Sequence, residues 1–227
     1  MAATRRTQQE RRDQAEAALL TAAAELVVEQ GVRSLTLARV GQRAGYSRGI
    51  VTHHFGGKQA LVERLARATQ AGFVPGLDDL PPGLDRLLRL VDGYLGELAR
   101  IGVFNQAFLL LWAEAATQPD LASIFRERDD AFRADLRDDV KAGIADGVVD
   151  PCMRPDDVAI AIVGQLRGIA LQRLLDPRGV DVEQVRRSVT AYWRRALSPA
   201  FEHGESGVLQ GGQADSRVVQ EGSSDPS

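Results

Sequence analysis

Cysteine is almost absent from the 227-residue sequence, which has a single one, Cys152. One cysteine cannot form a disulfide within the chain, and it excludes a cysteine-rich zinc module. Long apolar runs are also missing. The longest uncharged apolar stretch, residues 101–113, contains Asn105 and Gln106 and falls short of the roughly 20 apolar residues that a membrane span needs. No apolar segment follows the N-terminal arginines, as a secretory signal would require. We therefore expect a cytoplasmic protein that inserts into no membrane and holds no metal or cofactor.

Alternating apolar and polar runs, which are typical of half-buried strands, do not occur, and neither does an internal repeat. Apolar residues recur instead at helical spacing through almost the whole chain, so the sequence predicts an all-α fold. Thr7 and Glu10 have the spacing of a capping box before the first helix, which Gly31 ends. Further helices are expected near 37–44, 47–54, 58–73, 84–100, 104–117, 119–145, 155–175 and 182–197, with a linker rich in proline and glycine at 72–83.

Acidic residues are missing from one segment of this mildly acidic chain. The net charge is −3, yet residues 1–60 hold nine basic and five acidic side chains, and residues 33–60 hold no acid at all. A local basic segment on an acidic protein favours a binding site for a polyanion. Chance clustering on a solvated surface is the alternative.

Two short helices are predicted inside this basic segment. Thr36 can cap the first, Gly45 suits a sharp turn, and Ser47 can cap the second. Two short helices joined by a glycine-containing turn form a helix-turn-helix, whose second helix enters the major groove of DNA. Lys58 begins the next helix, where its charge and the free amides could hold a phosphate.

The second short helix offers side chains for base contacts. Those expected to be exposed are Ser47, Arg48, Gly49, Thr52, His53 and His54. Those expected in the core are Val40, Tyr46, Ile50, Val51, Phe55 and Leu61. Arg48 is the strongest candidate for base recognition, because arginine paired to guanine is the commonest specific contact, although a phosphate contact is the alternative. The adjacent histidines point about 100° apart on a helix and have no carboxylate beside them, which disfavours a metal site. Arg5, Arg6, Arg11 and Arg12 could reach the DNA or simply be solvated.

The segment from Thr36 to Leu61 resembles the DNA-binding signature of the TetR family of transcriptional regulators. The match rests on Thr36, on Ala44-Gly45, on Gly49, on His54-Phe55 and on Lys58. The resemblance implies phosphate contacts from Thr36, Thr52, His54 and Lys58, and base contacts from Ala38, Arg48, Gly49 and His53. The sequence departs from the family pattern at two positions. Thr52 replaces a usual tyrosine and reaches less far. Gly41 replaces a usual alanine and is expected to weaken its helix by about 1 kcal/mol.

These observations divide the chain into four parts. They are a flexible basic arm at 1–7, a helix-turn-helix DNA-binding domain at 8–60, a helical regulatory and dimerisation domain at 61–198, and a disordered tail at 199–227. The resemblance further implies a repressor that binds a palindromic operator as a homodimer and is released by a small-molecule effector.

The last two helices are candidates for pairing with a second subunit. Ala161, Gly164 and Gly168 form a stripe of small residues that would let another helix approach closely, and the final helix adds Val185, Val189 and Trp193. Packing within one chain would explain the same pattern.

A ligand cavity is expected among the middle helices of the larger domain. The residues proposed to line it are Tyr94, Phe104, Asn105, Gln106, Phe108, Trp112 and Glu114. Apolar walls with a few polar groups suit a small ligand, and Glu114 would favour a cationic one if it pointed inward. Each aromatic residue could equally belong to an ordinary core.

Two other classes of function are weighed against a ligand-released repressor. An enzyme is disfavoured, because the chain has no G-x-S-x-G, P-loop, dinucleotide fingerprint or H-E-x-x-H motif. Asp146, Asp150, Asp156 and Asp157 fit solvated loop acids better than a metal cluster. The other alternative is a helix-turn-helix regulator, an activator or a ligand-independent protein, that acts through a protein partner. A fully packed larger domain would favour that alternative, whereas an open cavity would favour ligand sensing.

Overall fold

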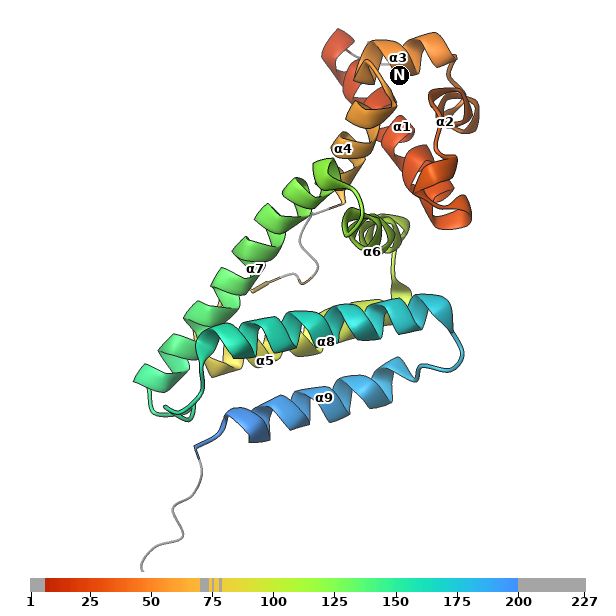
Figure 1. The fold of residues 1–227 in the computed structure, drawn as a ribbon. Coiled ribbons are helices and arrows are strands. Elements are labelled where there is room, and N and C mark those ends of the chain that lie inside the picture. The colour runs from red at the N-terminus through yellow and green to blue at the C-terminus, as the bar shows by residue number, and fades with distance from the viewer. Residues whose placement is uncertain (1–6, 70–73, 75, 78, 200–227) are drawn as a thin grey trace, which may run out of the picture.

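The computed structural model describes residues 7–69, 74, 76–77 and 79–199. Throughout these ranges the regular structure is helical, which confirms the predicted all-α fold (Figure 1). The predicted tail from residue 200 onward and the arm up to residue 6 lie outside the described residues. Thr7, the last residue of the predicted arm, is the N-cap of the first helix. Its amide donates to Glu10 Oε2 at 2.7 Å and its hydroxyl accepts from the Glu10 amide at 3.2 Å, which completes the predicted capping box.

Four helices and one 3-10 turn form the N-terminal unit. In chain order they are α1 (Gln8–Gln30), η1 (Val32–Ser34), α2 (Leu37–Ala44), α3 (Arg48–Phe55) and α4 (Lys58–Ala68). Leu19 of α1, Leu35 after η1 and Leu61 of α4 are completely buried and form the centre of its core. Burial of side chains of this size supplies about 1.5–3 kcal/mol each, which is the main stabilisation that so small a unit has.

The C-terminal unit is larger. Its elements are α5 (Leu84–Glu97), η2 (Leu98–Arg100), α6 (Val103–Ala115), α7 (Pro119–Ala145), α8 (Pro155–Leu175) and α9 (Val182–Leu197). The long helix α7 packs on α8, and α5 packs on both α8 and α9 (Figure 1). Pro119 and Pro155 occupy first-turn positions, as the sequence predicts, because a missing amide costs nothing there.

The two units meet along two helices of each. The helix α1 packs on α6, and α4 packs on α7. The expected helix at 58–73 ends earlier, because α4 stops at Ala68 with Thr69 as its C-cap. Residues 70–73 lie outside the described part. Because these helices are in contact, a shift of α6 would displace α1, and a shift of α7 would displace α4.

One helix of the described part, α8, is long and apolar enough to cross a membrane by length and composition alone. Core helices of soluble proteins pass the same test, and 39% of the apolar window of α8 is buried inside the protein. Its Arg167 is buried and ion-paired with Asp129 of α7. These contacts join α8 to the rest of the C-terminal unit.

Candidate functional site

The turn between α2 and α3 has the geometry of a helix-turn-helix. Thr36 caps α2 by accepting from the Arg39 amide at 3.2 Å, and Ser47 caps α3 by accepting from the Ile50 amide at 3.4 Å. Gly45 adopts the left-handed conformation, with φ 77° and ψ 25°, which a residue with a side chain rarely does. All three positions agree with the sequence prediction.

Gly41 has a structural role that helix propensity alone does not capture. Its carbonyl accepts from the Tyr46 amide at 2.8 Å, and a Cβ added at Gly41 would lie 2.7 Å from the Tyr46 carbonyl oxygen and 3.1 Å from a Val51 methyl. The gain of about 1 kcal/mol that helix propensity predicts for alanine is therefore opposed by this contact. Glycine here lets the turn pack closely against α2.

One face of α3 and the residues around its N-terminus are open to solvent. Ser47, Arg48, Gly49, Thr52 and His53 are exposed, His54 is half-buried, and Thr36, Ala38 and Lys58 are exposed beside them. Val51 and Phe55 hold α3 to the core, as expected. Ile50 does not: its residue is 41% exposed, so its assignment to the core is wrong. It lies on the same helix as Arg48 and Gly49, where an apolar side chain can meet a thymine methyl group.

Four basic residues of the segment 33–60 already have partners within the protein, and the first of them, Arg33, pairs with Glu114 at 3.3 Å. Arg43 forms ion pairs with Glu29 at 2.7 Å and Glu25 at 3.2 Å, and its hydrogen bond lowers the pKa of Glu29. Arg39 donates to the Ser34 carbonyl at 3.0 Å, and Lys58 donates to the Arg33 carbonyl at 3.1 Å.

Arg48 differs from these residues. It is exposed and forms no ion pair within the part of the chain that the structure describes. Thr52 donates its hydroxyl to the Arg48 carbonyl at 3.0 Å, which still leaves the hydroxyl oxygen able to accept. The Arg48 guanidinium is therefore available for a base edge without first losing a salt bridge.

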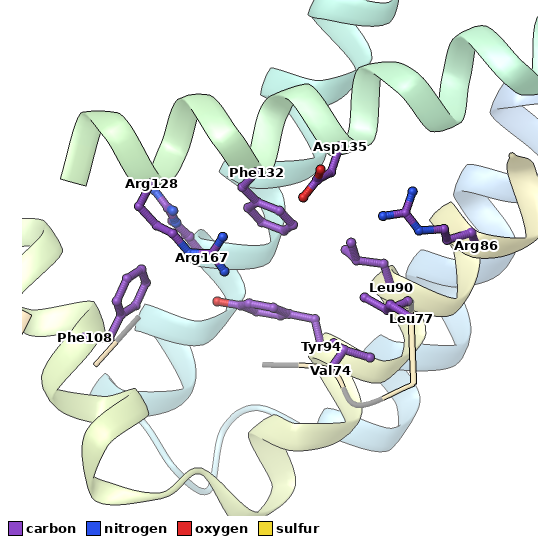
Figure 2. Close-up of a pocket in the computed structure, with 10 residues that line it drawn as sticks. All are labelled: Val74, Leu77, Arg86, Leu90, Tyr94, Phe108, Arg128, Phe132, Asp135 and Arg167. Carbon is purple, nitrogen blue, oxygen red and sulfur yellow. The ribbon is translucent and has the colours of Figure 1, made fainter. Parts of the chain in front are cut away.

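A cavity of about 200 Å³ lies in the C-terminal unit between α5, α6, α7 and α8 (Figure 2). Its apolar and aromatic lining is Val74, Leu77, Leu90, Tyr94, Phe108 and Phe132. Its charged lining is Arg86, Arg128, Asp135 and Arg167. We refer to it below as the α5–α8 cavity.

A buried ion pair forms one wall of this cavity. Arg167 of α8 is only 4% exposed and makes a bidentate contact with Asp129 of α7, with Arg167 Nη1 at 2.6 Å from Asp129 Oδ2. The indole nitrogen of Trp112 on α6 donates to the same carboxylate at 3.0 Å. One carboxylate thus joins three helices, because arginine and carboxylate match in planar, two-point geometry.

A second acid is buried at the opposite end. Asp139 Oδ1 accepts from the Gly83 amide at 3.0 Å and from Arg86 Nη1 at 3.1 Å. Its Oδ2 has no partner among the described residues, and burial raises the pKa of Asp139. Burial also raises the pKa of Tyr94 to about 12, so this phenol stays protonated at neutral pH.

The structure brings only part of the predicted ligand site together. Tyr94 and Phe108 line the cavity, and Trp112 lies behind Arg167. Phe104 and Asn105 are half-buried but outside the lining, and Gln106 donates to the Ile101 carbonyl. Glu114 does not point inward: it pairs with Arg33 at 3.3 Å and accepts from Gln118 at 2.6 Å. The condition under which Glu114 would favour a cationic ligand is therefore not met.

The sequence did not predict the charged residues that line the cavity. Arg86, Arg128 and Arg167 occur among many surface arginines, and no spacing distinguishes them. The nearest signal was the position of Arg167 within an otherwise apolar stretch of α8.

The residues expected at a subunit interface lie in different surroundings. Ala161 and Gly164 are exposed, Gly168 and Val185 are half-buried, and Val189 and Trp193 are buried within the chain itself. The Trp193 indole donates to Gln165 at 2.7 Å and so ties α9 to α8. The exposed large apolar residues of this region include Ile160 at 58% and Tyr192 at 51%.

Models of known protein families match both the N-terminal and the C-terminal unit. The model of bacterial regulatory proteins of the TetR family matches residues 19–65. The model of the C-terminal domain of BetI-type transcriptional repressors matches residues 83–198.

Individual relatives and solved structures give the same result. The transcriptional regulator BetI 1 of Chromohalobacter salexigens is 24% identical over 193 residues, which are 82% of this chain and 91% of that protein. BetI of Escherichia coli is 33% identical over 109 residues, or 45% of this chain and 56% of that protein. A regulator of Saccharomonospora viridis solved in complex with choline has a TM-score of 0.69 at 19% identity, covering 82% of this chain and 98% of its own. A TetR-family regulator from Rhodococcus has a TM-score of 0.65 at 21% identity, covering 82% and 100%.

A capped two-helix motif with an open second helix, joined to a larger helical unit, defines a helix-turn-helix DNA-binding regulator. The chain belongs to the TetR family and carries the C-terminal domain of BetI-type repressors. It is a DNA-binding transcriptional repressor, and its family is not enzymatic. Regulators of this family usually bind DNA as dimers and respond to small-molecule effectors.

Proposed function

We propose that this chain is a cytoplasmic homodimeric repressor that binds a palindromic operator and leaves it when a small molecule occupies the α5–α8 cavity. The observation that carries the proposal is the cavity itself, which opens in the unit that DNA binding does not need. A fully packed domain would instead favour a regulator that acts through a protein partner.

The exposed end of α3 supports recognition of bases. Arg48 is assigned a base contact, with Ala38, Gly49 and His53 beside it and Ile50 added for a thymine methyl group. Phosphate contacts are assigned to Thr36, Thr52, His54 and Lys58, with Ser47 at the cap of the helix. One motif covers few base pairs, so two copies related by a two-fold axis would recognise half-sites about one helical turn apart.

Contacts between the units support communication from the cavity to the DNA. Trp112 of α6 binds the same Asp129 carboxylate as Arg167, and α6 packs on α1. Near the C-terminal end of α6, Glu114 pairs with Arg33, which lies in η1 four residues before α2 begins at Leu37. A ligand that moves Arg167 would shift α6 and, through it, the angle of α3. Release then requires that the ligand bind one form of the dimer more tightly than the other.

The test has two parts. Selection from random duplexes with the full chain should return a palindromic consensus, and fluorescence anisotropy should then show loss of this duplex on addition of a ligand found by thermal-shift screening. A consensus without two-fold symmetry contradicts the dimer. A cavity ligand that leaves DNA affinity unchanged contradicts effector release.

Replacing Arg48 by alanine should relax base preference at one position of each half-site. The expected cost is about 1–3 kcal/mol for the preferred base pair, because the bidentate contact to its edge is lost. Binding-site selection with the variant measures this directly. An unchanged consensus of unchanged strength would assign Arg48 to the backbone or to solvent.

Replacing Lys58 by alanine should weaken binding to all sequences equally. Loss of one phosphate contact reduces the slope of log affinity against log salt by about 0.9. Anisotropy titrations at several salt concentrations, on the selected duplex and on a scrambled one, measure this slope. If the slope does not change, Lys58 serves only the hydrogen bond to the Arg33 carbonyl.

A further inference from the structure

The charges around the α5–α8 cavity are unevenly distributed. Arg167 is neutralised by Asp129 behind it, and Arg86 by Asp139. Of the remaining lining charges, Asp135 lies toward Arg86, whereas Arg128 lies beside Arg167 (Figure 2). The end formed by Arg128 and Arg167 therefore has an excess of one positive charge.

Asp135, the acidic residue of the lining, offsets the positive charge of Arg128 only weakly. Asp135 is exposed, so water screens it, whereas Arg128 is half-buried. Arg128 forms no ion pair in the described part of the chain, and its only assigned contact is with the Phe132 ring, 5.9 Å from the ring centroid. Arg128 is thus the charged group that a ligand can pair with.

Three aromatic rings in or beside the cavity, those of Phe108, Trp112 and Phe132, already have a guanidinium group over them. The Arg167 guanidinium lies 4.6 Å from the centroid of Trp112 and 5.5 Å from that of Phe108. Arg128 covers Phe132. Quaternary ammonium ligands are recognised on open aromatic faces. At Phe108 and Phe132 such a ligand would meet rings that already carry guanidinium groups, and Arg128 and Arg167 would repel it.

A hydrogen-bond donor reinforces the positive end. The hydroxyl of Tyr94 points toward Arg167 and Phe108 (Figure 2). The protonated phenol can donate to an anion, and the Arg128 guanidinium supplies further donors in a planar fork that fits a carboxylate. The opposite walls, from Val74, Leu77 and Leu90, are aliphatic.

We propose that the effector of this repressor is a small organic anion, with a carboxylate at Arg128 and Tyr94 and an apolar body against Leu77 and Leu90, and not a quaternary ammonium compound. The proposal rests on the function proposed above and specifies the ligand class of the same cavity. The volume of about 200 Å³ is below the roughly 300–1,000 Å³ of typical drug-sized sites, so the body is expected to be small.

Three probes of nearly the same shape separate charge from fit. They are choline, the neutral 3,3-dimethylbutan-1-ol and the anionic 3,3-dimethylbutanoate, supplemented by benzoate and the straight-chain acids from butanoate to octanoate. Isothermal titration of the full chain should give the tightest binding for a carboxylate, with choline no tighter than the neutral alcohol. Tighter binding of choline than of its anionic counterpart, or no carboxylate binding at millimolar concentration, overturns the proposal.

Substitutions of Arg128 test its role. Arg128→Met should raise the Kd of the best carboxylate about tenfold to hundredfold, because a charge-assisted hydrogen bond is lost, and should leave the neutral alcohol unaffected. Arg128→Lys should recover part of the affinity. The matched control is Arg126→Met, an exposed arginine of α7 outside the lining, which should change nothing. Equal losses for the alcohol and the carboxylate would show an effect of shape and overturn the assignment.

Release of the selected duplex is measured on the same samples. This measurement distinguishes failure of the proposed ligand class from failure of the proposed effector-released repression. Carboxylate binding that leaves the duplex bound upholds the ligand class and contradicts effector release. Release by choline without carboxylate binding upholds effector release and contradicts the ligand class.

Discussion

Replacing Asp129 by alanine is expected to lower the free energy of unfolding by about 3–5 kcal/mol. The substitution leaves the buried Arg167 guanidinium without its carboxylate and removes the acceptor of the Trp112 indole. Charge buried without a partner is among the few causes of losses this large. Urea denaturation followed by circular dichroism measures the change.

A double variant supplies the control. Asp129→Leu combined with Arg167→Met replaces the whole ion pair by apolar side chains of similar length, and such replacements are often neutral or stabilising. The double variant should therefore be more stable than Asp129→Ala. A loss below about 1 kcal/mol in Asp129→Ala would mean that water reaches Arg167, and that the pair is a surface contact.

The ends of the helices were the most predictable part of the fold. Thr7 and Glu10, Ser47, Pro119 and Pro155 each satisfy or avoid a free backbone amide within a few residues of sequence, so local chemistry alone places them. Long-range packing decides where a helix frays or tightens, and there the prediction was less good. The expected helix at 84–100 changes to a 3-10 turn after Glu97, and the expected helix at 58–73 stops at Ala68.

The cavity was less predictable than the fold, because its chemistry depends on distant partners. Arg167 lies on α8 among apolar residues, where periodicity indicates an inward face but cannot tell that a charged residue shares it. Its carboxylate, Asp129, is 38 residues away on another helix. Glu114 was instead predicted to line the cavity and does not. Its partner is Arg33 in the N-terminal unit.

The surroundings of three apolar residues differ from those that the sequence suggested, although the subunit interface itself stays a prediction. Ile50 was assigned to the core and is exposed, whereas Val189 and Trp193 were assigned to a subunit interface and are buried in the chain. A helical stripe shows that residues share a face, but it does not show whether that face meets the same chain, another subunit or DNA. The packing of α9 on α5, together with the hydrogen bond from Trp193 to Gln165 of α8, accounts for the burial of Val189 and Trp193 within the chain.

Replacing Gly164 by arginine is expected to abolish the proposed dimer and to weaken operator binding about 10²–10⁴-fold, because the avidity of two linked half-site contacts is lost. Gly164 is exposed on α8, close in sequence to the exposed Ile160 and Ala161. A Cβ added there meets nothing within 4 Å outside the adjacent turns of α8. The substitution therefore leaves the subunit fold undisturbed and even improves helix propensity.

Sedimentation and operator binding of the Gly164→Arg variant test this expectation. Thermal unfolding of the same variant shows whether the subunit is still folded. The matched control is Ala131→Arg, which adds the same side chain at an exposed position of α7. The variant at Gly164 should be a folded monomer that binds duplexes only weakly, whereas the control should remain dimeric and bind normally. A Gly164→Arg protein that stays dimeric would place the two-fold axis on another face, because a long charged side chain cannot be accommodated where two helices approach closely.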